Sequence, residues 1–261
     1  MKINTWTIIF SLFIFKSSFY CFASDAKENF PLFGEVYFES TRLTEAKTFA
    51  GFTQVRTGRA WESGQLETYI TARMGADSRT NSENSLSVYN DNFVFTGVGV
   101  DYLGILPGFR ATSQVGASFD LSSKIHSGGF DFRIGSQSYH EINWIGRKLV
   151  SEVYSELLYF RRYLNLLGNI QFRTVYNLVT ASIGNTRLEF APLVNIVGAV
   201  DSQGLDYNRF GELRMGARIT FRGPITVALS PYYVLGARWA RPTNTPQYED
   251  FRILLTGFIS I

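Results

Sequence analysis

The sequence contains few of the residues that form covalent cross-links, metal centres or catalytic triads. It has one cysteine, Cys21, and two histidines, His126 and His140. Such a small supply excludes a disulfide framework and a cysteine-ligated zinc site. The sequence also lacks a phosphate loop, an HExxH motif and a dinucleotide fingerprint. We therefore expect no metal, nucleotide or other cofactor.

Long apolar runs are absent after the first residues, so no later membrane-spanning helix is expected. The run from Trp6 to Phe15 is itself short for a spanning helix, follows Lys2 and precedes the small residue Ala23. This pattern predicts a secretory signal peptide, residues 1–23, which is cleaved after Ala23. The alternative is an uncleaved membrane anchor. Residues 24–32 are then a short N-terminal segment in the periplasm.

The rest of the chain also lacks an excess of positive charge. The leader removes Lys2 and Lys16 but no acidic residue, so the remaining basic and acidic residues nearly balance. Binding of nucleic acid depends on a basic surface. We therefore expect no nucleic-acid partner.

What the sequence has in abundance is alternation of polar and apolar residues. In "ELRMGARITFR" (212–222) the even positions carry a glutamate and three arginines, and the odd positions are apolar. A helix would scatter both sets around its axis, whereas a strand sends them to opposite faces. Similar segments recur at 33–43, 48–61, 65–76, 92–103, 108–121, 129–141, 149–162, 169–180, 186–200, 210–222, 224–240 and 248–261. We predict an all-β fold for residues 33–261, a transmembrane antiparallel β-barrel of about 12 strands.

The connections between these segments support a barrel in the bacterial outer membrane. Longer polar connections, such as "DSRTNSENSLSVYND", alternate with tight ones such as "SIGN" and "GP". Outer-membrane barrels have long extracellular loops and short periplasmic turns. Aromatic residues near strand ends, among them Trp61, Tyr102, Trp144 and Tyr248, suit interfacial girdles. The final segment "FRILLTGFISI" resembles the C-terminal signature recognised by the barrel-assembly machinery, which we expect as a partner alongside outer-membrane lipid.

Two segments fit this pattern less well. The connection around "NWIGRK" (143–148) is long for a periplasmic turn. The segment "LVSEVYSELLYFRRYL" (149–164) also fits an amphipathic helix, because Leu149, Val153, Leu157, Phe160 and Leu164 share one helical face.

In a barrel the apolar row faces lipid and the charged row faces the lumen. The candidate lumen-lining residues are Arg56, Arg73, Arg110, Arg133, Arg173, Glu212, Arg214, Arg218, Arg222 and Arg252. Inward acidic residues such as Glu35, Glu39, Glu67 and Glu152 nearly balance them. The structural interpretation is that paired charges fill and stiffen the barrel. The functional interpretation is a narrow charged channel, in which forked arginine donors contact hydroxyl, carboxylate or phosphate groups of a solute.

An enzyme is not expected, although some outer-membrane barrels hydrolyse lipids. His126 and Ser127 are adjacent in an extended segment, so their side chains point apart and do not form a nucleophile and base. Asn90 and Asp91 in "YNDN" are explained as turn residues before a strand.

The segments "YNDNFVFTGVGVDY", "FDFRIGSQSYHEINW" and "SEVYSELLYFRRYLNLLGNIQFRTVYNL" resemble the C-terminal barrel of bacteriophage-adsorption and exopolysaccharide-export outer-membrane proteins. The resemblance covers about residues 85–180 and rests on aromatic and glycine placement. It implies polysaccharide passage or cell-surface recognition. That barrel commonly follows periplasmic helical repeats, but strand-like sequence here begins shortly after the leader. A separate periplasmic partner is therefore expected to take the place of the repeats.

We thus predict a narrow charged channel or export conduit for oligosaccharides or other small polar solutes. The alternatives are a closed structural or surface-recognition barrel acting through its extracellular loops, and an outer-membrane lipid hydrolase.

Overall fold

The computed structural model describes residues 32–43, 48–61, 65–77, 93–121, 128–161, 164–203, 209–238 and 247–260. The predicted leader, residues 1–23, and nearly all of the predicted segment 24–32 lie outside the described residues. The same holds for most of the predicted long connections, including 78–92 and 122–127.

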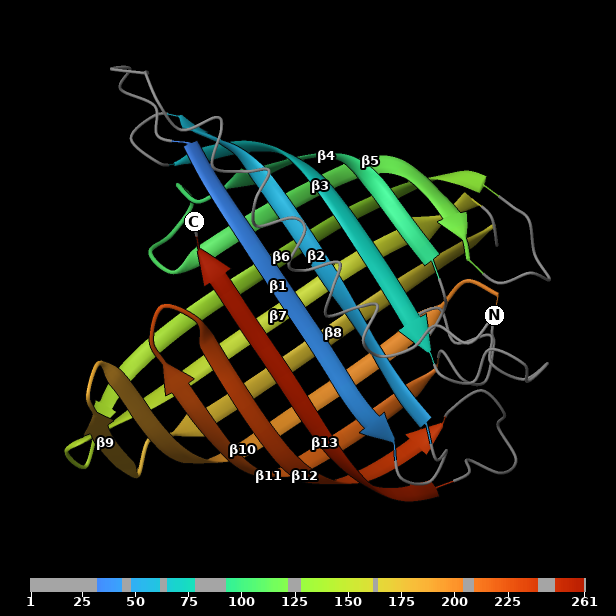
Figure 1. Ribbon diagram of the computed structural model, residues 1–261. Coiled ribbons are helices and arrows are strands. Elements are labelled where there is room, and N and C mark those ends of the chain that lie inside the picture. Colours follow the sequence, from blue (N-terminus) through green and yellow to red (C-terminus); the bar gives the residue numbers. More distant parts are fainter. Residues whose placement is uncertain are drawn as a thin grey trace.

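The described chain forms one antiparallel sheet that closes on itself (Figure 1). The strands are β1 (Leu32–Leu43), β2 (Thr48–Trp61), β3 (Leu66–Asp77), β4 (Phe93–Tyr102), β5 (Phe109–Asp120), β6 (Gly128–Trp144), β7 (Arg147–Phe160), β8 (Asn165–Tyr176), β9 (Val179–Ile183), β10 (Thr186–Asp201), β11 (Phe210–Arg222), β12 (Thr226–Arg238) and β13 (Gln247–Ser260). Each strand pairs with its neighbour in sequence, except that β8 pairs with β10, and β13 returns to pair with β1. The short strand β9 pairs with β10 alone, so the other twelve strands make the closed barrel.

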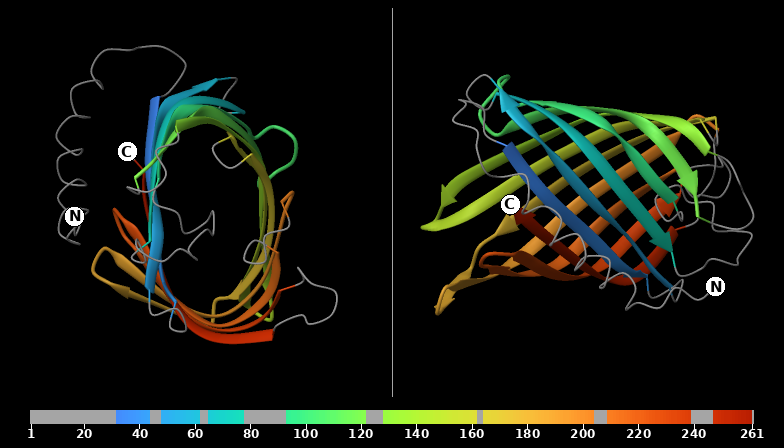
Figure 2. Two further views of the ribbon diagram at one scale, coloured as in Figure 1. Left: turned by 90° about the vertical axis from the view of Figure 1, so that its right-hand side faces the viewer. Right: turned by 45° about the horizontal axis from the view of Figure 1, so that its top comes forward.

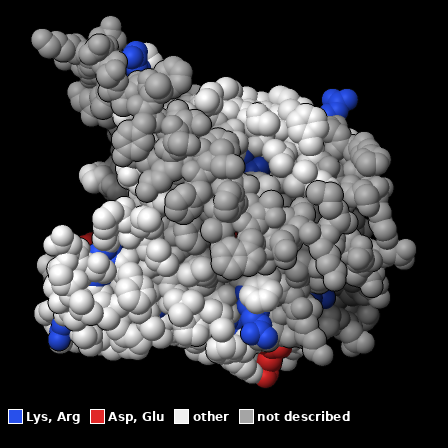
Figure 3. Space-filling view, viewed as in Figure 1, with Lys and Arg blue, Asp and Glu red and all other residues white. Residues whose placement is uncertain are grey.

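Alternation along each strand separates an apolar outer face from a polar inner face. In β4, Val98 and Val100 are 54% and 44% exposed, whereas the next residue, Asp101, is 1% exposed. In β10, every second residue from Glu189 to Asp201 is buried or nearly so. A closed sheet leaves no unpaired edge around the wall, which is the condition for a strand structure inside a bilayer. On the face drawn in Figure 3, most of the described surface is uncharged, with charged side chains scattered over it.

Aromatic residues mark the end of the barrel that carries the short turns. Trp61, Tyr102, Trp144 and Tyr176 are the last residues of β2, β4, β6 and β8. The rings of Trp144 and Tyr176 meet edge to face at 5.7 Å between centroids. This placement is typical of a periplasmic interfacial girdle. The prediction was wrong for Tyr248, whose hydroxyl donates to Glu212 on the inner face at 2.5 Å.

The interpretation of "NWIGRK" as a long connection was wrong. Strands β6 and β7 continue to Trp144 and Arg147, and only Ile145 and Gly146 join them. Both residues have positive φ, 49° and 69°. A two-residue type I′ hairpin turn requires positive φ at both central residues. The helical alternative for 149–164 was also wrong, because β7 pairs along its whole length with β6 and β8.

The predicted strand 169–180 is divided in two by a local irregularity. Strand β8 ends at Tyr176, and β9 continues the same side of the ladder from Val179. Between them, β10 contributes Ala191 and Pro192, where the ladder to β8 and β9 is interrupted. Proline has no backbone N–H to donate, so it is tolerated where a ladder is broken by a bulge. The β9–β10 hairpin therefore extends the wall beyond the end of β8.

The barrel is oval in cross-section when viewed along its axis (Figure 2, left). Strand β1 lies on one long side, and the strands in yellow, β7 and β8, lie on the other. Strand β1 therefore faces β7 and β8 across the short dimension. No helix in the described residues is long and apolar enough to cross a membrane.

Candidate functional site in the barrel lumen

The ten predicted lumen-lining residues all occupy inward positions of the alternation. Most of them form ion pairs with acidic residues of other strands. Arg222 is the most exposed of those in ion pairs, with 54% of its side chain accessible at the periplasmic end of β11. Their role in transport stays a prediction. In the structure these residues and their partners form separate groups at different heights in the lumen.

The first group, the Asp101 cluster, lies in the periplasmic half of the barrel. Asp101 is 1% exposed and accepts hydrogen bonds from Arg56 Nη1 at 2.5 Å and from the Tyr69 hydroxyl at 2.8 Å. Arg56 also donates through Nε to Glu35 on β1. Arg110 lies 3.6 Å from Asp101 and therefore adds a second cation. Side chains of five consecutive strands, β1 to β5, are thus joined on the inner face.

The second group, the Glu212 cluster, lies near the opposite, extracellular end. Glu212 is 4% exposed and accepts two hydrogen bonds from Arg252, from Nη1 to Oε2 and from Nη2 to Oε1, both at 2.9 Å. Arg214 donates to it at 2.7 Å and Tyr248 at 2.5 Å. Arg252 also donates to Asp250 at 2.9 Å. Two arginines therefore share two buried carboxylates, a fully paired arrangement.

The third group, the central cluster, crosses the short dimension of the oval. From β1, the Tyr37 hydroxyl donates to Glu39 at 2.8 Å. From β7, the Tyr154 hydroxyl donates to Glu156, which also pairs with Arg133 of β6 at 3.3 Å. Tyr154 lies within electrostatic reach of Glu39, so the two walls approach each other here.

Two arginines of the opposite wall face Tyr37 in the central cluster. Arg173 of β8 and Arg218 of β11 both act electrostatically on the Tyr37 hydroxyl. Arg173 is held by Glu152, to which its Nε donates at 2.8 Å. Arg218 has no acidic partner among the described residues, and its buried Nε has no hydrogen-bond partner. This difference separates Arg218 from the paired lumen arginines.

At the periplasmic mouth, Glu189 of β10 holds two cations. Arg187 Nε and Arg222 Nε lie 3.0 Å from its two carboxylate oxygens. Arg73 in the extracellular half is stabilised differently, because its guanidinium lies 3.9 Å from the centroid of the Phe52 ring and 5.9 Å from that of Phe93. Such cation–π contacts offset part of the missing ion pair.

Sequence reasoning missed several members of these clusters. Asp101 lies within the predicted strand 92–103 but was not named as a lumen residue, although the alternation of β4 places it inward with Gly99 and Phe95. Tyr37, Tyr154 and Glu189 were also not singled out. The alternation within each strand would have found them, if tyrosine and acidic residues at the inward positions had been considered along with arginine.

Most of the residues considered for an enzymatic site lie outside the described part of the chain. The described residues contain no group of three His, Cys, Asp or Glu side chains able to hold a metal ion. His140 is exposed on the outer face near the periplasmic end of β6. His126, Ser127, Asn90 and Asp91 lie outside the described residues.

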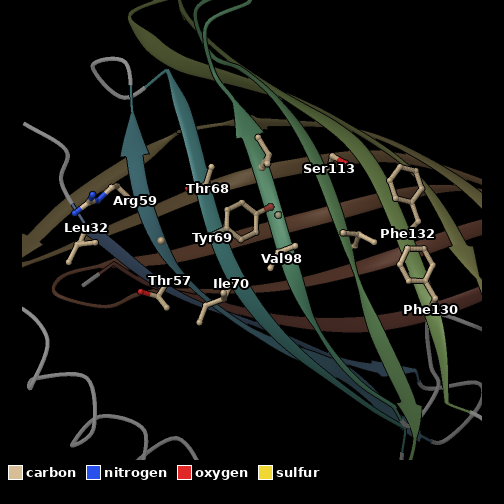
Figure 4. A pocket seen from close by; sticks show the side chains of 14 residues that line it. Leu32, Thr57, Arg59, Thr68, Tyr69, Ile70, Val98, Ser113, Phe130 and Phe132 are labelled. Atoms are coloured by element: carbon tan, nitrogen blue, oxygen red, sulfur yellow. The ribbon is translucent and has the colours of Figure 1, made fainter.

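A concave surface also occurs on the outer wall of β2 to β6 (Figure 4). Its lining includes Ile70, Val98, Phe130 and Phe132, with Arg59 near the periplasmic end. Because these side chains belong to the apolar outer face, this groove opens toward lipid and is separate from the lumen.

No protein-family model matches the chain, and no curated protein matches it. Among solved structures, the chain is similar to the beta domain of the Bordetella autotransporter BrkA, with 10% identity, a TM-score of 0.43, and coverage of 89% of this chain and 99% of that one. It is similar to an outer-membrane channel from Pseudomonas putida F1, with 12% identity, a TM-score of 0.44, and coverage of 91% and 97%. LpxR from Salmonella typhimurium gives 9% identity, a TM-score of 0.39, and coverage of 85% and 99%.

The architecture itself decides the location of the protein. An even number of antiparallel strands closes into a barrel, the outward positions are apolar, the inward positions are charged, and short turns gather at one end. Only a barrel in lipid requires this inversion of the usual polarity. The protein is a β-barrel of the bacterial outer membrane. The specific kinship with phage-adsorption and exopolysaccharide-export proteins stays a prediction.

Proposed function

We propose that the protein is a narrow charged channel that passes oligosaccharides or other small polar solutes across the outer membrane. The observation that carries the proposal is the continuity of polar groups along the inner wall. They run from the Glu212 cluster near the extracellular end, through the central cluster, to Glu189 and Arg222 at the periplasmic mouth. A polar solute in the lumen can replace the hydrogen bonds that it made to water by hydrogen bonds to this wall, at each height of the barrel.

The mixture of side chains suits a sugar better than a simple ion. Sugar hydroxyls both donate and accept hydrogen bonds, and the lumen offers arginine donors beside carboxylate acceptors. Tyrosines of three strands, Tyr37, Tyr154 and Tyr232, add ring faces and hydroxyl groups to the same wall. A ring with a polar edge matches the apolar and polar faces of a sugar ring.

The row of arginines on β11 favours an elongated solute. Arg214, Arg218 and Arg222 are spaced four residues apart on the inward face, which is about 13 Å of strand. That spacing is too long for two of them to hold one small anion, but it matches successive units of an extended chain. The resemblance to exopolysaccharide-export proteins is consistent with this solute class.

A closed structural or surface-recognition barrel is the second candidate, and one observation favours it. The Asp101 and Glu212 clusters pair almost all of their charges internally, as expected of a network that stiffens the wall. Recognition would then fall to connections such as 77–91 and 201–209. No contact among the described residues favours a lipid hydrolase.

Solute flux into liposomes separates the two candidates. Protein refolded into liposomes should let glucose and maltose enter at measurable rates, with the rate falling steeply for longer maltodextrins because the lumen is narrow. Empty liposomes and liposomes with heat-unfolded protein are the controls. Folded protein that passes none of these sugars would support the closed barrel and overturn the channel.

A further inference from the structure

Among the described residues, the inner wall of the barrel holds one guanidinium that has neither an acidic nor an aromatic partner. Arg56, Arg133, Arg173, Arg214, Arg222 and Arg252 all meet carboxylates within ion-pairing distance. Arg73 is stacked on aromatic rings. Arg218 has neither kind of partner within the described part of the chain.

The surroundings of Arg218 make this mismatch costly. It lies across the β10–β11 ladder from Ala191, which packs with Val175 and Leu193 in a buried apolar cluster. An apolar neighbour takes water from the guanidinium without replacing its hydrogen bonds. The ionisable groups that act most strongly on Arg218 are Arg173, Glu152, Arg222 and Tyr37, and two of these are also cations. Glu152, the carboxylate named among the groups that act most strongly on Arg218, already pairs with Arg173.

The wall that faces Arg218 contributes the hydroxyl group and ring of a tyrosine, together with one carboxylate. Tyr37 of β1 lies within electrostatic reach of Arg218, and its hydroxyl is hydrogen-bonded to Glu39. Glu39 has no cationic partner among the described residues. The narrow part of the lumen therefore has an unmatched cation on one wall and an unmatched acid on the other.

We propose that Arg218 is the anion-binding subsite of the lumen and takes the carboxylate or phosphate group of an acidic sugar. The proposal rests on the channel function and specifies its solute class. The forked N–H groups of arginine match a planar carboxylate or a phosphate. The acidic group of the solute completes the missing pair of Arg218, while the sugar ring lies against Tyr37. Glu39 repels the same acidic group and so limits how tightly it is held.

The test is calorimetric binding to the refolded protein in detergent micelles, with three sugar probes, two trisaccharides and one monosaccharide phosphate. Trigalacturonate carries carboxylates, maltotriose is neutral, and glucose 6-phosphate tests phosphate. We expect trigalacturonate or glucose 6-phosphate to bind at least several-fold more tightly than the neutral sugar. A preference for one of the two acidic probes identifies the acidic group.

Three variants locate the subsite. Arg218→Gln should weaken binding of the preferred acidic probe by on the order of tenfold, because a charge-assisted hydrogen bond is lost. Arg218→Lys should retain part of the affinity, since the charge stays and the fork is removed. Glu39→Gln should strengthen acidic binding by a few-fold. Arg42→Gln, on the outer face where Arg42 stacks on Phe49, is the matched control and should change nothing.

Equal binding of acidic and neutral sugars, or acidic binding unchanged in Arg218→Gln, would overturn the subsite. Heat-dependent gel mobility confirms that each variant is folded. Because binding is measured without a membrane, its outcome is independent of transport. If an acidic sugar binds at Arg218 but the barrel passes no solute, the subsite is upheld and the channel function is overturned. If sugars pass but acidic sugars bind no more tightly than neutral ones, the channel function is upheld and the subsite is overturned.

Discussion

Arg252 on β13 and Glu212 on β11 join two strands that are not neighbours, because β12 lies between them. Their two parallel hydrogen bonds, each 2.9 Å long, cross the inner face close to the seam where β13 meets β1. The wall near the seam is thus stabilised by side chains as well as by backbone hydrogen bonds.

Replacing Glu212 should therefore destabilise the barrel strongly. Glu212→Gln leaves Arg214 and Arg252 without their shared carboxylate, and a buried pair that loses one member costs about 3 kcal/mol. The measurement is urea unfolding of the refolded barrel in lipid vesicles. Glu249→Gln, a change of the same kind at the exposed Glu249 beside Tyr233, is the control. An unchanged unfolding midpoint for Glu212→Gln would contradict the role given to this pair.

Two arginines of the lumen should respond oppositely to the same substitution. Arg56→Gln leaves Glu35 without its cation and leaves Asp101 with Arg110 alone, so the free energy of unfolding should fall by about 2 kcal/mol or more. Arg218→Gln breaks no pair and relieves an unmatched charge, so stability should stay equal or rise. The temperature at which gel mobility shifts compares the two variants directly. Equal losses in both would show that Arg218 has a structural partner.

Much of this network was beyond prediction from the sequence. Alternation predicted the strands well, and residues 210–222 coincide with β11. It also predicted which arginines face inward, because parity alone decides that. It could not predict that Arg56 reaches past β3 to Asp101, since such contacts depend on the oval shape and on register. Nor could it distinguish Arg218 from Arg214, which has the same residue type, strand and face.

Two further features could be decided only from the strand pairing. The segment 149–164 satisfies both helical and strand periodicities, and only pairing with β6 and β8 decides between them. Pro192 lies in β10, where the ladder passes from β8 to β9. The alternating pattern gives no sign of this interruption, so the division between β8 and β9 could be recognised only from the strand pairing.

The packing of Tyr69 depends on the absence of a side chain at Gly99. A Cβ at Gly99 would lie 2.4 Å from atoms of the Tyr69 ring. Gly99→Ala should therefore displace Tyr69 from Asp101 and cost about 2 kcal/mol, as overpacking does. The control is Gly198→Ala, where a Cβ would meet only Ile170 at 3.4 Å. Urea unfolding measures both, and equal stability of the two variants would contradict the close packing.

The β6–β7 turn contains a residue poorly suited to its backbone. Ile145 has φ of 49°, a conformation that β-branched residues rarely adopt and asparagine tolerates. Ile145→Asn should therefore stabilise the barrel by about 1 kcal/mol, with Gly146 unchanged. Ile142→Asn, within the strand, is the comparison and should not stabilise. A loss of stability in Ile145→Asn would show that Ile145 makes contacts that outweigh the strain.

The most direct test of the channel is single-channel recording of the refolded protein in a planar bilayer. We predict discrete openings in the wild type. Arg218→Ala should lower the anion-to-cation permeability ratio by up to roughly thirtyfold, because one charge at about 4 Å in water favours an anion by about 1 kcal/mol and disfavours a cation by the same amount. Arg42→Ala, on the outer face, should leave the ratio unchanged. A silent bilayer with folded protein, or a ratio that Arg218→Ala does not alter, would contradict the account.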